Sequence, residues 1–123
     1  MYNQKVMERF KNQKFLGEIR SANAIGYAGD TSMGDIVKFY LVVEDGKITA
    51  AKAKVFGCVA SVAVASQTAE MLEGLSIEEA VEFDMSKVEE ELGGIPAEKS
   101  SILITSKQAI IEAMNYYFKK LEK

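Results

Sequence analysis

The residue with the most evident chemistry is Cys58, the only cysteine of the chain. It follows Gly57 at the corner where a predicted strand passes into a predicted helix. At a helix start, the dipole and the free backbone N–H groups favour thiolate over thiol, and Lys52 and Lys54 could add positive potential. A thiolate can bind a soft metal, accept sulfur as a persulfide or attack an electrophile. The alternative is a buried, inert cysteine, and position alone does not separate the two interpretations.

Two further donors precede a predicted strand. Asp35 follows Gly34, and its carboxylate could bind a metal or tune a bound one. The alternative is a turn residue that hydrogen-bonds nearby backbone. Met33 offers a thioether, a soft and neutral donor better suited to Cu(I) than to a ferric cluster. Packing is the ordinary role of a methionine, so each residue taken alone favours the structural interpretation.

Composition excludes several kinds of site. The chain has no histidine, so a histidine general base, a Ser-His-Asp triad and a histidine-bound metal are ruled out. One cysteine allows neither an internal disulfide nor a Cys/His zinc site within one chain. The formal net charge is −3, from 15 basic and 18 acidic residues, which argues against a nucleic-acid partner.

Nothing in the sequence points to a membrane or to export. No apolar run approaches the roughly 18 residues that a bilayer span requires. Residues 1–10 carry charges instead of the apolar segment of a signal peptide. With a single cysteine there is also no sign of an oxidising compartment. We therefore expect a cytoplasmic protein without a membrane partner.

The elements that must position these residues begin with a hairpin. Residues 36–43 and 48–56 are rich in strand-forming side chains, and Asp45-Gly46 between them predicts a type I′ turn. In the second strand small or apolar residues alternate with lysines, which predicts one covered face on which a helix packs closely. The members of this alternation are Thr49, Ala51, Ala53 and Val55 against Lys52 and Lys54.

The remaining elements follow from periodicity and capping patterns. Predicted helices are residues 3–10, residues 59–72, two short helices with capping boxes at Ser76 and Ser86, and a last helix from between 101 and 106 to 121. Residues 15–19 are predicted as a short first strand, and residues 21–33, rich in Gly, Ala, Ser, Asn and Asp, as a loop. Strands and helices are segregated, so we predict an α+β fold, a single domain over 1–123. Its helices should pack on one face of a small three-stranded antiparallel sheet.

Several short motifs in the same order resemble a known family. Met33-Gly34-Asp35, then Glu44-Asp45-Gly46, then the run 54–58 ending in Gly57-Cys58 are similar to the iron–sulfur cluster assembly scaffolds IscU, SufU and the N-terminal domain of NifU. The likeness extends from the opening helix to the helix after Cys58 and weakens near Ser100. Each motif alone is weak, but the collinear set is specific.

The resemblance implies a ligand set that this chain has largely lost. The family's cluster site has three cysteines, an aspartate and often a histidine. The second cysteine matches Cys58 and the aspartate matches Asp35, whereas the first cysteine falls at Met33. The third cysteine and its histidine fall around Ser100 and Ser101. Serine is a poor substitute, because its hydroxyl resists deprotonation near neutral pH. One chain thus retains one thiolate and one carboxylate, too few for an iron–sulfur cluster.

Two functions follow from this resemblance, and neither is that of an enzyme. The first is a degenerate scaffold that acts as an accessory or sulfur acceptor through Cys58, with cysteine desulfurase and cluster-recipient proteins as implied partners. An iron–sulfur cluster or zinc is implied by the family, but the donor count casts doubt on both. A symmetric homodimer could pool two Cys58 and two Asp35. The second is a cluster-free regulatory module that docks a desulfurase or another partner. An enzyme with Cys58 as nucleophile ranks last, because no second catalytic group stands out.

Overall fold

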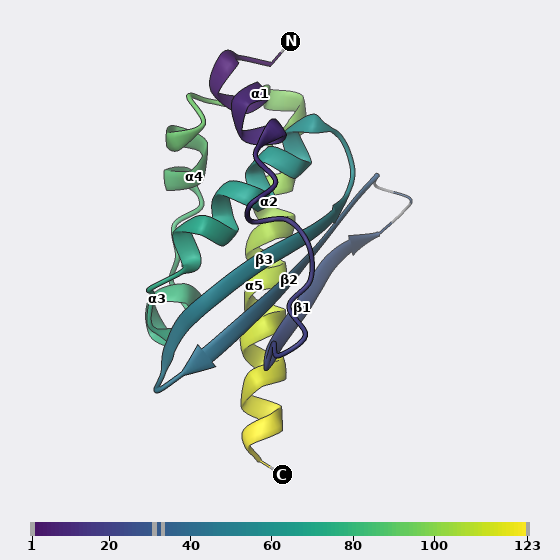
Figure 1. The fold of residues 1–123 in the computed structure, drawn as a ribbon. Helices are drawn as coiled ribbons and strands as arrows, with labels where there is room; N and C mark the ends of the chain where they lie inside the picture. Colours follow the sequence, from purple (N-terminus) through teal and green to yellow (C-terminus); the bar gives the residue numbers. More distant parts are fainter. Residues whose placement is uncertain (1, 31, 33, 123) are drawn as a thin grey trace.

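Three antiparallel strands form one sheet, and the longer helices cover one of its faces (Figure 1). The computed structural model describes residues 2–30, 32 and 34–122. The elements in chain order are α1 (Gln4–Lys11), β1 (Ala24–Asp30), β2 (Asp35–Glu44), β3 (Lys47–Phe56), α2 (Val59–Leu72), α3 (Ile77–Val81), α4 (Ser86–Glu91), the 3-10 helix η1 (Ala97–Lys99) and α5 (Ser101–Leu121). The predicted α+β class is confirmed. Among the described residues, no helix is long and apolar enough to cross a membrane.

The strands pair in the order β1-β2-β3, with β2 in the centre. The predicted hairpin is confirmed, because Asp45 and Gly46 have φ angles of 53° and 76°, as a type I′ turn requires. The alternation predicted for β3 fails at its start, since the pairing shifts register between Val42 and Val43. A bulge of this kind turns the following side chains over. Thr49 is therefore exposed instead of facing the helices.

The first strand of the sheet is not the one predicted. A strand was expected at residues 15–19 and a loop at residues 21–33, but β1 spans Ala24–Asp30. Residues 15–17 make only an isolated parallel bridge to β3, in which the N–H of Gly17 donates to the carbonyl oxygen of Ala53 at 2.9 Å. The prediction was wrong because Gly and Ala are loop signals by composition, whereas here their small size serves packing.

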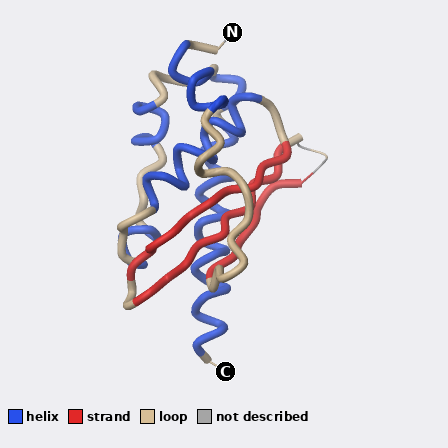
Figure 2. Tube along the Cα trace, viewed as in Figure 1, coloured by secondary structure: helices blue, strands red, loops and turns tan. Residues whose placement is uncertain are grey.

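That packing joins β1 to α5, which runs behind the sheet and extends past it (Figure 2). A Cβ atom at Gly26 would lie 2.1 Å from the backbone nitrogen of Ala113 and 2.6 Å from the carbonyl oxygen of Ala109. No side chain fits that space, so the two backbones approach closely only because position 26 is glycine. Beside this contact, the fully buried Val37, Phe39 and Leu41 of β2 belong to the hydrophobic core.

The opening helix α1 is fastened to the rest of the fold at both ends. Asn3 caps α1, and its side-chain Nδ2 also donates to the carbonyl oxygen of Gly94 at 3.0 Å. At the other end, Arg9 donates through Nε to Ser66 Oγ at 2.9 Å and pairs with Glu70, both on α2. Residues 3–9 are thereby held against the body of the fold.

The helices after α2 follow their predicted starts, with one correction. At α3, Ser76 Oγ accepts the N–H of Glu79 at 3.1 Å and the Glu79 carboxylate accepts the N–H of Ser76 at 2.9 Å, so this capping box is confirmed. The capping box predicted at Ser86 is wrong. The N–H of Ser86 donates to Asp84 Oδ1 at 2.9 Å, so the aspartate two residues earlier supplies the acceptor. The last helix, Ser101–Leu121, begins and ends as predicted.

Candidate functional site

Cys58 lies at the corner between β3 and α2, where it is the N-cap residue of α2 with extended backbone (φ −85°, ψ −179°). Its side chain is half-buried. The sulfur does not meet the geometry of a full capping hydrogen bond, but the backbone N–H groups of Ser61 and Ala60 are close enough to stabilise a thiolate. Lys54, expected as a source of positive potential here, instead pairs with Glu18, with Nζ and Oε2 2.5 Å apart.

One serine joins the two residues that the sequence singled out. Ser61 Oγ lies 3.4 Å from Cys58 Sγ and donates its hydroxyl to Asp35 Oδ1. Ser61 is buried, with 1% of its surface exposed, so bulk water does not easily replace either contact. A serine has a single hydroxyl proton. The hydroxyl can therefore donate either to Asp35 or to a Cys58 thiolate, but not to both at once.

Gly57 makes room for this arrangement. A Cβ atom at this position would lie 2.3 Å from Asp35 Oδ1 and 2.9 Å from Ser61 Oγ. Its backbone is not in the left-handed region, so the reason for glycine here is the space that the carboxylate takes. The carboxylate of Asp35, at the start of β2, therefore occupies the space that a side chain would take at position 57, just after β3 ends.

The surroundings of Cys58 act on its ionisation in both directions. Burial opposes the charged form, but the hydrogen bond with Ser61, the backbone N–H groups of Ser61 and Ala60, and the hydroxyl of Tyr2 outweigh it. Together they lower the pKa of the Cys58 thiol. The pKa of Tyr2 is raised, first by its hydrogen bond with Cys58 and then by burial. The corner thus favours a reactive thiolate.

Two members of this group were missed by sequence reasoning. Ser61 follows Cys58 by three residues, the spacing that joins an N-cap residue to the third helical position, so a signal was present. Tyr2 carries no such signal, because it reaches Cys58 from the far end of the chain. Only the docking of α1 on α2 brings it there.

The other predicted ligand positions are not joined to this group. Ser100 is the N-cap residue of α5 and makes no side-chain capping bond. Ser101 is exposed, and its carbonyl oxygen accepts the hydroxyl of Thr105 at 3.2 Å. No hydrogen bond between described residues connects either serine to Cys58 or Asp35. Met33 lies outside the described residues.

The donors at this corner do not fit an iron–sulfur cluster or a zinc ion held by one chain. Within residues 2–30, 32 and 34–122, no group of three or more Cys, Asp or Glu side chains could hold a metal ion. One thiolate remains, and the neighbouring carboxylate accepts a serine hydroxyl. Four thiolate, carboxylate or imidazole ligands are the normal requirement. What the corner can do alone is the chemistry of a single activated thiol.

The whole chain, residues 1–123, matches the family model described as the NifU-like N terminal domain. It is 36% identical over 120 residues to the iron-sulfur cluster assembly scaffold protein IscU 1 of Archaeoglobus fulgidus, covering 98% of this chain and 78% of the relative. It is also 36% identical over 100 residues to the scaffold protein IscU of Aquifex aeolicus, covering 80% of this chain and 64% of that protein.

Solved structures show the same fold. FiSufU, a SUF-system protein of Fervidobacterium islandicum AW-1, superposes with a TM-score of 0.75 at 20% identity, over 92% of this chain and 96% of that one. A NifU-like protein (N-terminal) of Brucella abortus gives a TM-score of 0.76 at 16% identity, over 96% of this chain and 94% of that one. At such low identity these two likenesses concern the fold alone.

Proposed function

The chain belongs to the family of NifU-like N-terminal domains, and from this premise we propose that it serves iron–sulfur cluster assembly by accepting sulfur on Cys58. In this proposal it is an accessory of the assembly system, and it does not hold a complete cluster by itself. Its partners are a cysteine desulfurase that supplies the sulfur and a protein that receives it.

The observation that carries the proposal is the environment of the single cysteine, Cys58. One thiolate cannot hold a cluster, but one thiolate is all that a sulfur acceptor needs. The pKa of Cys58 is lowered at a helix N-terminus, and a thiolate is the attacking form in sulfur exchange. Asp35, which the family would use as a ligand, is turned to Ser61.

The transfer step balances without an added oxidant. The Cys58 thiolate attacks the outer sulfur of a persulfide on the desulfurase, and a new S–S bond forms at Cys58 while the S–S bond of the donor breaks. The donor cysteine leaves as a thiolate, and the transferred sulfur keeps its hydrogen or loses it to water. A thiolate on the recipient would take the outer sulfur by the same exchange, so that the S–S bond at Cys58 breaks and Cys58 leaves as a thiolate.

Mass spectrometry tests the proposal directly. The protein is incubated without oxygen with a cysteine desulfurase and free cysteine, and the intact mass is measured. We expect a gain of about 32 Da, one sulfur atom, located on the peptide that contains Cys58. The Cys58→Ser variant, which has no thiol, is the control and should gain nothing. An unmodified Cys58 in a protein that still reacts with a small alkylating agent would contradict sulfur acceptance.

A second candidate is a cluster-free module that regulates the desulfurase by docking on it. The hydrogen bond from Ser61 to Asp35 favours this regulatory module, because the Asp35 carboxylate is already engaged in a structural contact. Binding measurements separate the two functions. Docking that inhibits the desulfurase equally with Cys58→Ser, and with no sulfur transferred, would support the regulatory module. Reconstitution with iron and sulfide tests the premise common to both, since a stoichiometric, stable cluster on a monomer would overturn both.

A further inference from the structure

The two outer edges of the sheet differ in how they are covered. Along β3, the N–H of Ile48 donates to the carbonyl oxygen of Leu75 at 2.8 Å, and the N–H of Ala53 donates to the carbonyl oxygen of Phe15 at 2.9 Å. Along β1, by contrast, no hydrogen bond reaches residues 24–29 from any described residue other than those of β2 or the strand's own chain neighbours. An uncovered edge exposes backbone donors and acceptors to any extended chain that comes near.

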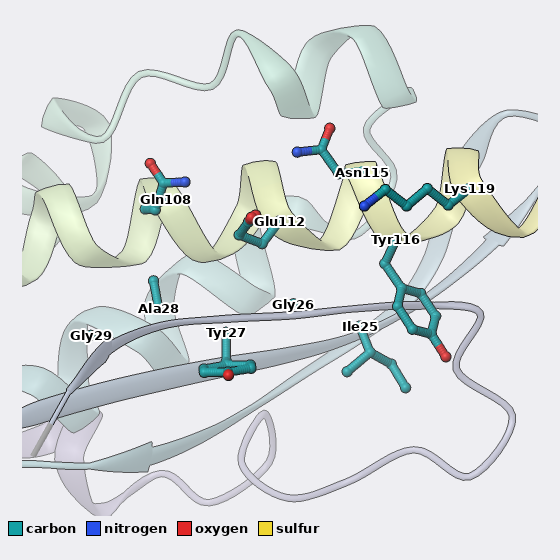
Figure 3. A pocket seen from close by; sticks show the side chains of 10 residues that line it. All are labelled: Ile25, Gly26, Tyr27, Ala28, Gly29, Gln108, Glu112, Asn115, Tyr116 and Lys119. Atoms are coloured by element: carbon teal, nitrogen blue, oxygen red, sulfur yellow. The ribbon is translucent and has the colours of Figure 1, made fainter.

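A hollow of about 540 Å³ runs along this open edge, between β1 and α5 (Figure 3). Its floor is mostly backbone, because three of its β1 residues are Gly26, Ala28 and Gly29. Its wall is made by side chains of α5, among them Glu112 and Lys119 (Figure 3). The sequence of β1, AIGYAGD, also contains neither lysine nor proline, two residues that often protect an edge strand.

Two side chains at this edge, Glu112 and Tyr27, lack partners among the described residues. Glu112 is half-buried, yet its carboxylate forms no ion pair or hydrogen bond with a described residue. A half-buried carboxylate is stabilised by a cation placed beside it. Tyr27, in the middle of β1, is 64% exposed. The edge thus offers an unpaired strand, an unpaired negative charge and an exposed aromatic ring.

We propose that the β1 edge binds an extended segment of a partner protein by strand addition, with a lysine or arginine of that segment opposite Glu112. β1 has seven residues, so a segment of similar length would pair along it. Backbone hydrogen bonds would supply most of the affinity, and Glu112 the preference for a basic side chain. This site is separate from the thiol of Cys58 and goes beyond sulfur acceptance.

A second copy of this chain fits the edge less well. A twofold axis that pairs two β1 strands antiparallel in register would pass near Tyr27, the middle residue. Glu112 lies at the same level, since a Cβ atom on Gly26 would lie 2.6 Å from the carbonyl carbon of Glu112. Such a dimer would bring two Glu112 carboxylates towards each other, and like charges at a pairing edge are unfavourable. A segment with a basic residue has no such conflict.

Nuclear magnetic resonance of the labelled full chain tests the proposal with defined peptides. The probe is a capped seven-residue peptide of alternating valine and threonine with lysine at its centre. Two control peptides have glutamate at the centre, or proline in place of a central valine. We expect the lysine peptide to shift the amide signals of residues 24–29 and to bind about fivefold more tightly than the glutamate peptide. The proline peptide, which cannot complete the ladder, should cause no such shifts.

Charge reversal makes the test specific to Glu112. In Glu112→Lys the preference should invert, so that the glutamate peptide binds more tightly. Glu122→Lys, the same change at an exposed position near the end of the helix, should leave the preference as in the parent protein. To detect weak binding, the lysine peptide is also tethered to the C-terminus through a Gly/Ser linker, which raises its effective concentration to the millimolar range. Slower amide hydrogen exchange in β1 is expected in the tethered chain.

Three results would overturn the proposal. One is unchanged β1 signals and exchange even with the tethered peptide. Another is equal binding of the lysine and glutamate peptides. The third is a concentration-dependent dimer that shifts the same amides without peptide, which would assign the edge to a second copy. Because none of these measurements involves Cys58, their failure would leave the sulfur-acceptor proposal untouched.

Discussion

The Cys58 corner and the contact between β1 and α5 are both built around a glycine, but for different reasons. At the corner, Gly57 leaves room for a carboxylate and a serine hydroxyl, which are polar side-chain atoms. Between β1 and α5, Gly26 lets one backbone touch another. The contact at Gly57 can be altered by exchanging side chains. The contact at Gly26 is made by the backbones of β1 and α5, so it belongs to the fold itself. The difference shows how a chain can change its chemical groups and still keep its architecture.

The largest effect is expected from Gly26→Ala. The new methyl group would meet the backbone of α5 at 2.1 Å, and a helix backbone cannot yield as a side chain can. We expect a loss of about 3 kcal/mol in the free energy of unfolding, or no folded protein. Urea denaturation followed by circular dichroism measures it. Gly34→Ala is the control, because its φ of 87° costs conformational strain with nothing within 4 Å of the new atom, so about 1 kcal/mol should be lost. Equal losses in the two variants would contradict the role of close approach at Gly26.

A smaller and local effect is expected from Gly57→Ala. The methyl group would lie 2.3 Å from Asp35 Oδ1, and a side chain can move away. We expect a loss of about 1–2 kcal/mol in the free energy of unfolding, measured by urea denaturation. The double variant Gly57→Ala/Asp35→Ala removes both partners of the clash and should recover part of the loss, as a double-mutant cycle reports. Strictly additive losses would show that Gly57 and Asp35 do not compete for space.

The smallest effect on stability, and the most specific for chemistry, is expected at Ser61. In Ser61→Ala the hydrogen bond that favours the thiolate is lost, so the pKa of Cys58 should rise. Asp35→Ala should lower that pKa, because it frees the Ser61 hydroxyl for the sulfur and removes a nearby negative charge. The rate of alkylation by iodoacetamide between pH 6 and 10 gives the pKa in each variant. Tyr2→Phe should raise it less than Ser61→Ala does. Shifts of the same sign in Ser61→Ala and Asp35→Ala would contradict a shared hydroxyl proton.

The lowered pKa of Cys58 in the parent protein makes a small part of the free energy of unfolding depend on pH. The folded protein binds the thiol proton less tightly than the unfolded chain, because the pKa of Cys58 is lowered on folding. The resulting contribution is fully present above the ordinary thiol pKa and is lost as pH falls through the lowered value. In Cys58→Ser this dependence should disappear.

Much of the framework could be predicted from local patterns. Asp45-Gly46 indicated the hairpin, Ser76 with Glu79 indicated the start of α3, and Gly57-Cys58 indicated the corner. Each of these depends on residues a few positions apart, which interact in the same way in any fold. Ser86 misled because a nearby acceptor, Asp84, competed for the same N–H.

The sequence alone determined the kinds of chemistry open to this protein: with one cysteine and no histidine, a single thiol is its reactive group. Only the tertiary structure decided which strand completes the sheet and what surrounds that thiol. Gly26 becomes part of a strand because α5 lies against it, and Tyr2 reaches Cys58 because α1 docks on α2. Contacts between residues so far apart depend on how helices pack, and no local pattern records that packing.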